Sequence, residues 1–154
     1  MINFQYKYNF KHKIMLKVAN SILGTNYDNW NDLSKHKYLC ENFILDFADY
    51  VNWKEISECQ QLSENFICKF KDKVNWERIC YSQHLSEDFI RKFKDRVDWY
   101  HISRKPKLSE DFIREFQDKV SWKDIIFYQR LSKEFCQEFK DKIDEVFKEY
   151  EYYI

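Results

Sequence analysis

The chain of 154 residues contains a single glycine and a single proline. Phosphate-binding loops and dinucleotide-binding turns need several glycines, because only glycine lets the backbone approach the phosphates closely enough. The turns of β-sheets and long loops also depend on glycine and proline. The scarcity of both residues therefore argues against a nucleotide-dependent enzyme and favours an all-helical chain.

Signals for metal or nucleophilic chemistry are also missing. The four histidines are scattered, with no H-E-x-x-H spacing, and the five cysteines lack C-x-x-C spacing. We interpret the cysteines as reduced packing residues. We expect no enzymatic activity, no cofactor and no metal site. These residues are His12, His36, His84 and His101, and Cys40, Cys59, Cys68, Cys80 and Cys136.

Long apolar segments and a net charge are absent as well. No stretch approaches the roughly 18 apolar residues of a membrane-spanning helix, and the first residues lack the basic–apolar–small pattern of a signal sequence, so we expect none. The formal net charge is +0, so the chain as a whole has no electrostatic attraction to nucleic acid or to a membrane. We therefore expect a soluble cytoplasmic protein with no membrane partner. With 19% aromatic residues the chain is too apolar to be disordered.

The sequence instead repeats one pattern every 23 residues. Each of five copies opens on a leucine, which we call position 1. Phenylalanine recurs at positions 5 and 9, aspartate at 11, valine or isoleucine at 13, and, in the first four copies, tryptophan at 15 and isoleucine at 18. Such a fixed period is typical of a solenoid, in which each unit buries its apolar face only against its neighbours. The five leucines are Leu39, Leu62, Leu85, Leu108 and Leu131.

Each copy is predicted to hold two helices. Positions 1, 5, 6, 9 and 13 share one helical face, and serine at position 2 in the last four copies is a good N-cap. A second set of N-cap residues stands at position 14: Asn52, Asn75, Asp98, Ser121 and Asp144. We predict a helix of about ten residues followed by one of about seven. The fold class is all-α, an α-solenoid of short two-helix, 23-residue repeats with degenerate terminal caps.

The two ends depart from the pattern. Residues 10–23 have apolar residues every fourth position, which predicts a helix that ends at Gly24. Trp30 lies 23 residues before Trp53, so residues 16–38 are a degenerate copy. We predict an N-terminal arm and capping repeat over 1–38, tandem repeats over 39–144, and a C-terminal capping helix over 145–154.

Residues 1–9 alternate apolar and polar side chains, which is typical of a β-strand. One hypothesis is an irregular or helical arm packed over the first repeat. The other is a strand that pairs with a partner edge or with a second copy, which would make a homodimer through residues 1–10.

Two repeated columns are candidates for chemistry. The aspartates at position 11 could bind a cation, but a residue that the chemistry needs only once has no reason to occur five times. We therefore predict that these aspartates bind turn amides or neighbouring basic residues, here Lys71, Lys73, Lys94 and Arg96. The tryptophans could stack on bases, but their place between two apolar positions predicts core.

Function is expected where the copies differ, at positions 16, 17, 20 and 21, which we predict to lie on the outward side of the second helix. Aromatic residues and arginine concentrate there, as in the centres of protein interfaces. We predict binding of another protein, with a merely solvated face as the alternative. The predicted partner-binding residues are Tyr81, Tyr100, His101, Arg104, Lys105, Phe127 and Tyr128.

An alternative is a nucleic-acid-binding protein that uses the basic face of the central first helices, although acids are interleaved there. Its predicted contacts are Lys69, Lys73, Arg91, Lys92, Lys94 and Arg96. A third, weaker alternative is a small-ligand site on the concave face.

The motif L-S-E-x-F-I-x-x-F-x-D-x-V-x-W, as in Leu85 to Trp99, resembles tandem repeats of uncharacterised proteins of giant DNA viruses and phages. The resemblance covers about residues 39–143, and no chemistry is attached to that family. It implies a viral setting, in which small repeat proteins block host factors. We therefore expect a virus- or phage-encoded inhibitor that covers the surface of a host defence protein in the cytoplasm of the host cell.

Overall fold

The computed structural model describes residues 4–151, and the side chains of residues 10–148. This part of the chain forms twelve helices and no strand, in two compact units, residues 1–83 and 84–154. Unit 1 contains α1 (Phe4–Leu23), α2 (Trp30–Ser34), α3 (Glu41–Asp46), α4 (Trp53–Cys59), α5 (Glu64–Lys69) and α6 (Trp76–Ser82). Unit 2 contains α7 (Glu87–Lys92), α8 (Trp99–Ser103), α9 (Glu110–Glu115), α10 (Trp122–Tyr128), α11 (Lys133–Glu138) and α12 (Lys140–Glu151).

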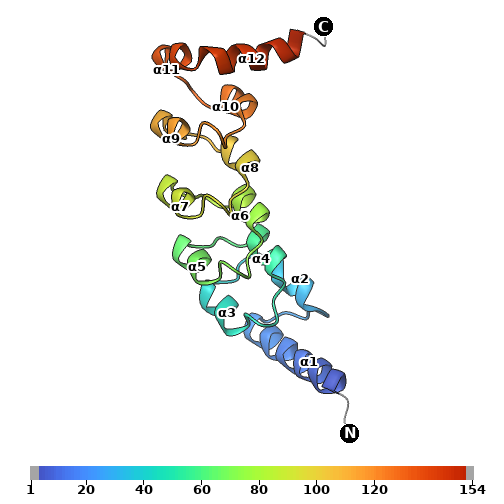
Figure 1. Ribbon diagram of the computed structural model, residues 1–154. Helices are drawn as coiled ribbons and strands as arrows, with labels where there is room; N and C mark the ends of the chain where they lie inside the picture. Colours follow the sequence, from blue (N-terminus) through green and yellow to red (C-terminus); the bar gives the residue numbers. More distant parts are fainter. Residues whose placement is uncertain (1–3, 152–154) are drawn as a thin grey trace. The chain divides into compact units, whose positions relative to one another are not determined.

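Two kinds of short helix alternate along each unit (Figure 1). We call the first helix of each copy its A helix (α3, α5, α7, α9, α11) and the second its B helix (α4, α6, α8, α10). B helices of successive copies contact one another, α4 with α6 in unit 1 and α8 with α10 in unit 2. Helix α2 contacts α4 in the same way, so the degenerate copy caps the stack. The predicted α-solenoid of two-helix repeats is confirmed.

The predicted N-caps at positions 2 and 14 are confirmed, except Asp144 in the last copy. The serine hydroxyl at position 2 accepts a hydrogen bond from the phenylalanine N–H at position 5, at 3.1 Å in α5, α7, α9 and α11. The residue at position 14 caps the B helix likewise, as when the Asp98 carboxylate accepts from the His101 N–H at 3.0 Å. Each cap satisfies a backbone donor that has no partner within its helix. Cys40 replaces the first serine and makes no such bond.

The A helices have six residues and not the predicted ten. Each ends before the second phenylalanine, and the chain then turns. The indole N–H at position 15 donates to the position-10 carbonyl in this turn, at 2.9 Å from Trp53 to Ala48 and 3.0 Å from Trp99 to Lys94. Because the indole holds this carbonyl, the turn between the two helices is stabilised.

The core is a column of repeated side chains. The isoleucines of the A and B helices, such as Ile90 and Ile102, are fully buried, and Phe112 and Phe135 are as well. The four tryptophans at position 15 are only half-buried, so their predicted place in the core is only partly correct. The rings of Trp53, Trp99 and Trp122 lie on the phenylalanine pair of the next copy, with centroids 4.8 Å apart for Trp99 and Phe116.

A buried glutamine at position 22 joins successive copies, a contact that the sequence did not predict. Gln60 is 3% exposed; its side-chain oxygen accepts from the Leu39 N–H at 3.0 Å. Its amide donates to the carbonyls of Ser34 and His36, at 3.1 and 2.8 Å. Gln83 and Gln129 make equivalent bonds. We call this arrangement the glutamine clamp. In the third copy the position holds Pro106, which has no side-chain amide.

The predicted strand at the N-terminus is wrong over residues 4–9, which belong to α1; residues 1–3 lie outside the described residues. No glycine or proline separates residues 4–9 from the helical pattern that follows, so the helix continues through them. Residues 4–9 are thus helical, and α1 contacts the degenerate copy further along, where the Trp30 indole donates to the His12 carbonyl at 3.3 Å. Gly24 ends the helix with φ of 64°, as predicted.

The last copy also differs from prediction. Asp144 was predicted to cap a second helix, but it lies inside α12, which begins at Lys140 and not at 145. Glu145 stands where the other copies have tryptophan. Since no indole is present to hold the turn, the chain continues as one helix.

Candidate protein-binding surface

The predicted outward face of the B helices is confirmed for its aromatic residues. Tyr81, Tyr100, Phe127 and Tyr128 are 65%, 51%, 64% and 47% exposed. Position 17 does not face outward, because Asp124 is buried and His101 is half-buried. At Arg78 and Asp124 this position instead faces the B helix of the preceding copy.

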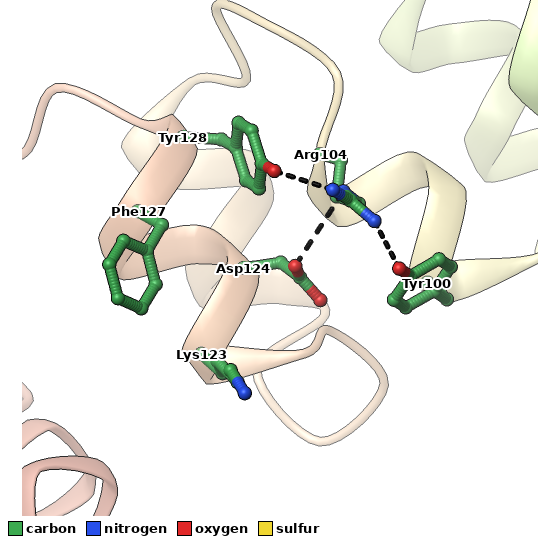
Figure 2. A pocket seen from close by; sticks show the side chains of 6 residues that line it. All are labelled: Tyr100, Arg104, Lys123, Asp124, Phe127 and Tyr128. Atoms are coloured by element: carbon green, nitrogen blue, oxygen red, sulfur yellow. Dashed lines mark hydrogen bonds and ion pairs between the residues drawn. The ribbon is translucent and has the colours of Figure 1, made fainter. Parts of the chain in front are cut away.

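Residues at the varied positions of α8 and α10 line a hollow between these two helices of unit 2 (Figure 2). The space is about 470 Å³ and is lined by Tyr100, Arg104, Lys123, Asp124, Phe127 and Tyr128. We call it the Arg104 hollow. Figure 2 shows the guanidinium of Arg104 between the two tyrosines, whereas the Phe127 ring points away from it toward solvent.

Arg104 is held by three neighbours at once. Its guanidinium lies 4.9 Å from the Tyr100 ring centroid and 4.8 Å from that of Tyr128, close enough for cation–π attraction. It donates to both tyrosine hydroxyls, at 2.5 Å for Tyr128, and pairs with Asp124 at 3.7 Å. The hydrogen bond to Tyr128, with smaller effects from the charges of the tyrosines and Asp124, raises the pKa of Arg104. Arginine is a cation at pH 7 even at its ordinary pKa, and these contacts hold the Arg104 guanidinium against both rings.

The sequence prediction listed Lys123 and Asp124 among the varied positions but not among the binding residues. An ion pair in unit 1 shows the sequence pattern from which the contact of Asp124 could have been predicted. Arg78, also at position 17, pairs with Glu58 at position 20 of the preceding copy, at 3.5 Å. Asp124 and Arg104 occupy the same two positions with the charges exchanged. Opposite charges 20 residues apart therefore indicate contact between neighbouring B helices.

The other predicted binding residues do not line the hollow. His101 lies beside Tyr100, with ring centroids 5.2 Å apart, and Lys105 is half-buried at the end of α8. Lys105 supplies a carbonyl to the clamp residue Gln129, at 2.6 Å. Tyr81 belongs to unit 1, so it is an exposed residue of a separate unit.

The basic face proposed for nucleic acid is partly neutralised. Arg91 pairs with Asp88 at 3.0 Å, with Glu87 at 3.6 Å and with Glu115 of the next copy at 2.6 Å. The hydrogen bond to Glu115 is the largest reason why the pKa of Arg91 is raised. Lys73 pairs with Asp49 at 2.8 Å. Lys69, Lys92, Lys94 and Arg96 are exposed. Arg91 and Lys73 are thus already bound to carboxylates.

Three of the aspartates at position 11 pair with the lysine at position 12 of the next copy. Asp49 pairs with Lys73, Asp95 with Lys119 at 3.2 Å, and Asp118 with Lys142 at 3.4 Å. The hydrogen bond and charge of Lys73 lower the pKa of Asp49. In the described part of the chain, no group of three or more His, Cys, Asp or Glu residues could hold a metal ion.

Two further results bear on the kind of site. Among residues 4–151, no helix combines the length and the apolar character that crossing a membrane requires. Comparisons of the chain with protein-family models, with curated proteins and with solved structures gave no match.

Proposed function

We propose that this chain is a non-enzymatic protein-binding module whose contact surface is centred on the Arg104 hollow. The observation that carries the proposal is the exposure of Tyr100, Phe127 and Tyr128 around one fixed arginine. Tyrosine and arginine are enriched among the residues that dominate binding energy, and exposed aromatic residues grouped together mark interaction sites.

The fixed geometry favours binding over solvation. Arg104 and the rings of Tyr100 and Tyr128 hold one another, so they lose little conformational freedom when a partner binds. The Phe127 ring, 64% exposed, then supplies apolar area beside a charged and polar centre. A protein surface offers both kinds of complement, apolar side chains and hydrogen-bond acceptors.

The proposed mode of action is occlusion, in which the module covers a working surface of its partner. On the resemblance of the repeats to those of viral and phage proteins, we propose that the partner is a host defence protein in the cytoplasm of the host cell. Nucleic-acid binding through the basic face of the A helices is the alternative outcome of the test.

The test is capture of partners from a lysate of the natural host with the tagged chain, with and without nuclease. The wild-type chain should retain one stoichiometric protein in both arms. The double variant Phe127→Ala/Tyr128→Ala should bind that protein at least about 30-fold more weakly, which corresponds to roughly 2 kcal/mol at a binding hot spot. Both side chains are about half exposed or more, so its thermal stability should stay close to that of the wild type.

Tyr38→Ala is the matched control, because Tyr38 is an aromatic residue of unit 1 that is 76% exposed and does not line the hollow. It should capture the partner as the wild type does. Equal capture by the double variant would place the contact elsewhere. Capture in the untreated arm alone, with steep loss at high salt, would show nucleic-acid binding instead.

A further inference from the structure

Helix α1 presents an apolar row to solvent. Phe10, Ile14, Val18 and Ile22 follow one another at every fourth residue, and they are 60%, 44%, 42% and 63% exposed. The opposite side of the helix, with Ala19 fully buried, faces the rest of unit 1. The outer face of a terminal repeat is normally polar, because no further repeat covers it. An apolar row at this place indicates that something packs there.

The charges of α1 are all of one sign. Its sequence contains lysines and no aspartate or glutamate. Lys11, Lys13 and Lys17 are exposed along the row. Two α1 helices packed row against row would bring these lysines together with no acid between them, which opposes a symmetric pair. The partner of α1 should therefore combine apolar and acidic side chains.

Helix α12, at the other end of the chain, has that combination. Its sequence holds five acidic and three basic residues. Asp141, Asp144 and Glu145 are exposed, and so is Phe147, at 52%. The other side of α12 contacts α10 and α11, so the exposed face is the one that a further repeat would cover.

We propose that α1 of one copy of this chain docks on α12 of a second copy, head to tail. The contact places the apolar row against Phe147 and the lysines of α1 opposite the acids of α12. It continues the stacking of repeats from one molecule to the next, and it is independent of the proposed partner-binding function. Because the two faces differ, the contact is heterologous, so each molecule has one α1 face and one α12 face with which to bind other copies.

The test is sedimentation velocity of the purified full chain from about 10 µM to about 1 mM, the range expected of a small and transient interface. At low salt the weight-average mass should rise at least about 1.5-fold over this range, and high salt should reduce the rise because it screens the lysines and acids. Ile14→Glu and Phe147→Lys should each stay monomeric, with thermal unfolding unchanged because both side chains are exposed.

Mixing the two variants separates this contact from others. Ile14→Glu keeps a working α12 and Phe147→Lys keeps a working α1, so an equimolar mixture should form a dimer and no larger species. A wild-type chain that is monomeric throughout would overturn the proposal. So would a Phe147→Lys chain that still self-associates alone, because that result would show α1 pairing with another α1 or with a different surface.

Discussion

Replacing Gln60 with methionine is expected to lower the free energy of unfolding by about 3 kcal/mol. Methionine has nearly the same volume, so no cavity forms, but it can neither accept from the Leu39 N–H nor donate to the carbonyls of Ser34 and His36. A buried backbone N–H without a partner costs roughly 1–3 kcal/mol, and two carbonyls lose a donor as well. The melting temperature should fall by roughly 10 °C.

The neighbouring residue supplies the control. Gln61 is exposed, so Gln61→Met should change the free energy of unfolding by less than about 0.5 kcal/mol. Both variants are compared with the wild type by urea unfolding followed by far-UV circular dichroism. Equal stability of the two variants would show that the clamp adds nothing to the free energy of unfolding.

Trp99→Ala is expected to lower the free energy of unfolding by about 3 kcal/mol. This is the lower end of the range for truncating a buried aromatic residue, because the ring is only half-buried. The ring stacks on Phe112 with centroids 6.2 Å apart and contacts Phe116 at 4.8 Å. Its indole N–H also holds the Lys94 carbonyl in the turn between α7 and α8. The variant therefore loses a contact between copies and a contact within one copy.

Two controls divide these effects. Trp99→Phe keeps an apolar ring and loses the hydrogen bond, so it should cost about 1 kcal/mol. Tyr100→Ala, at the next residue but on the exposed face, should cost less than that. If Tyr100→Ala destabilised unit 2 more than Trp99→Ala, the buried and exposed faces of α8 would be assigned wrongly.

The period of 23 and the residues that start helices could be predicted because each acts locally. Ser86 and Asp98 cap helices that begin at the next residue, so their effect can be inferred from neighbours in the sequence. Contacts between copies could not be predicted in this way, because they join residues 13 to 26 positions apart. The bonds of Gln60 to the carbonyls of Ser34 and His36 are an example, and a polar residue that recurs at one position was the sequence signal for them.

The candidate site was predictable in part. Exposure of Tyr100, Phe127 and Tyr128 follows from variation at positions that the helical period turns outward. Asp124 is buried and pairs with Arg104 because of the way α8 and α10 pack against each other. The helical period of a single helix carries no information on that packing. The apolar row of α1 was predicted as a helix, but its exposure depends on which face meets α2.

The central claim is that repeated residues hold the fold while varied residues bind the partner, and one helix allows a direct test. In α10, Ile125 is repeated and fully buried, whereas Phe127 is varied and 64% exposed. The measurement is thermal unfolding of Ile125→Val and Phe127→Ala, together with capture of the partner by each.

Ile125→Val removes one methylene, yet it should lower the free energy of unfolding by about 1 kcal/mol and leave capture of the partner intact. Phe127→Ala removes a whole ring, yet it should change stability by less than about 0.5 kcal/mol and weaken capture strongly. A Phe127→Ala chain that unfolds earlier than Ile125→Val, or that captures the partner as well as the wild type does, would contradict the account.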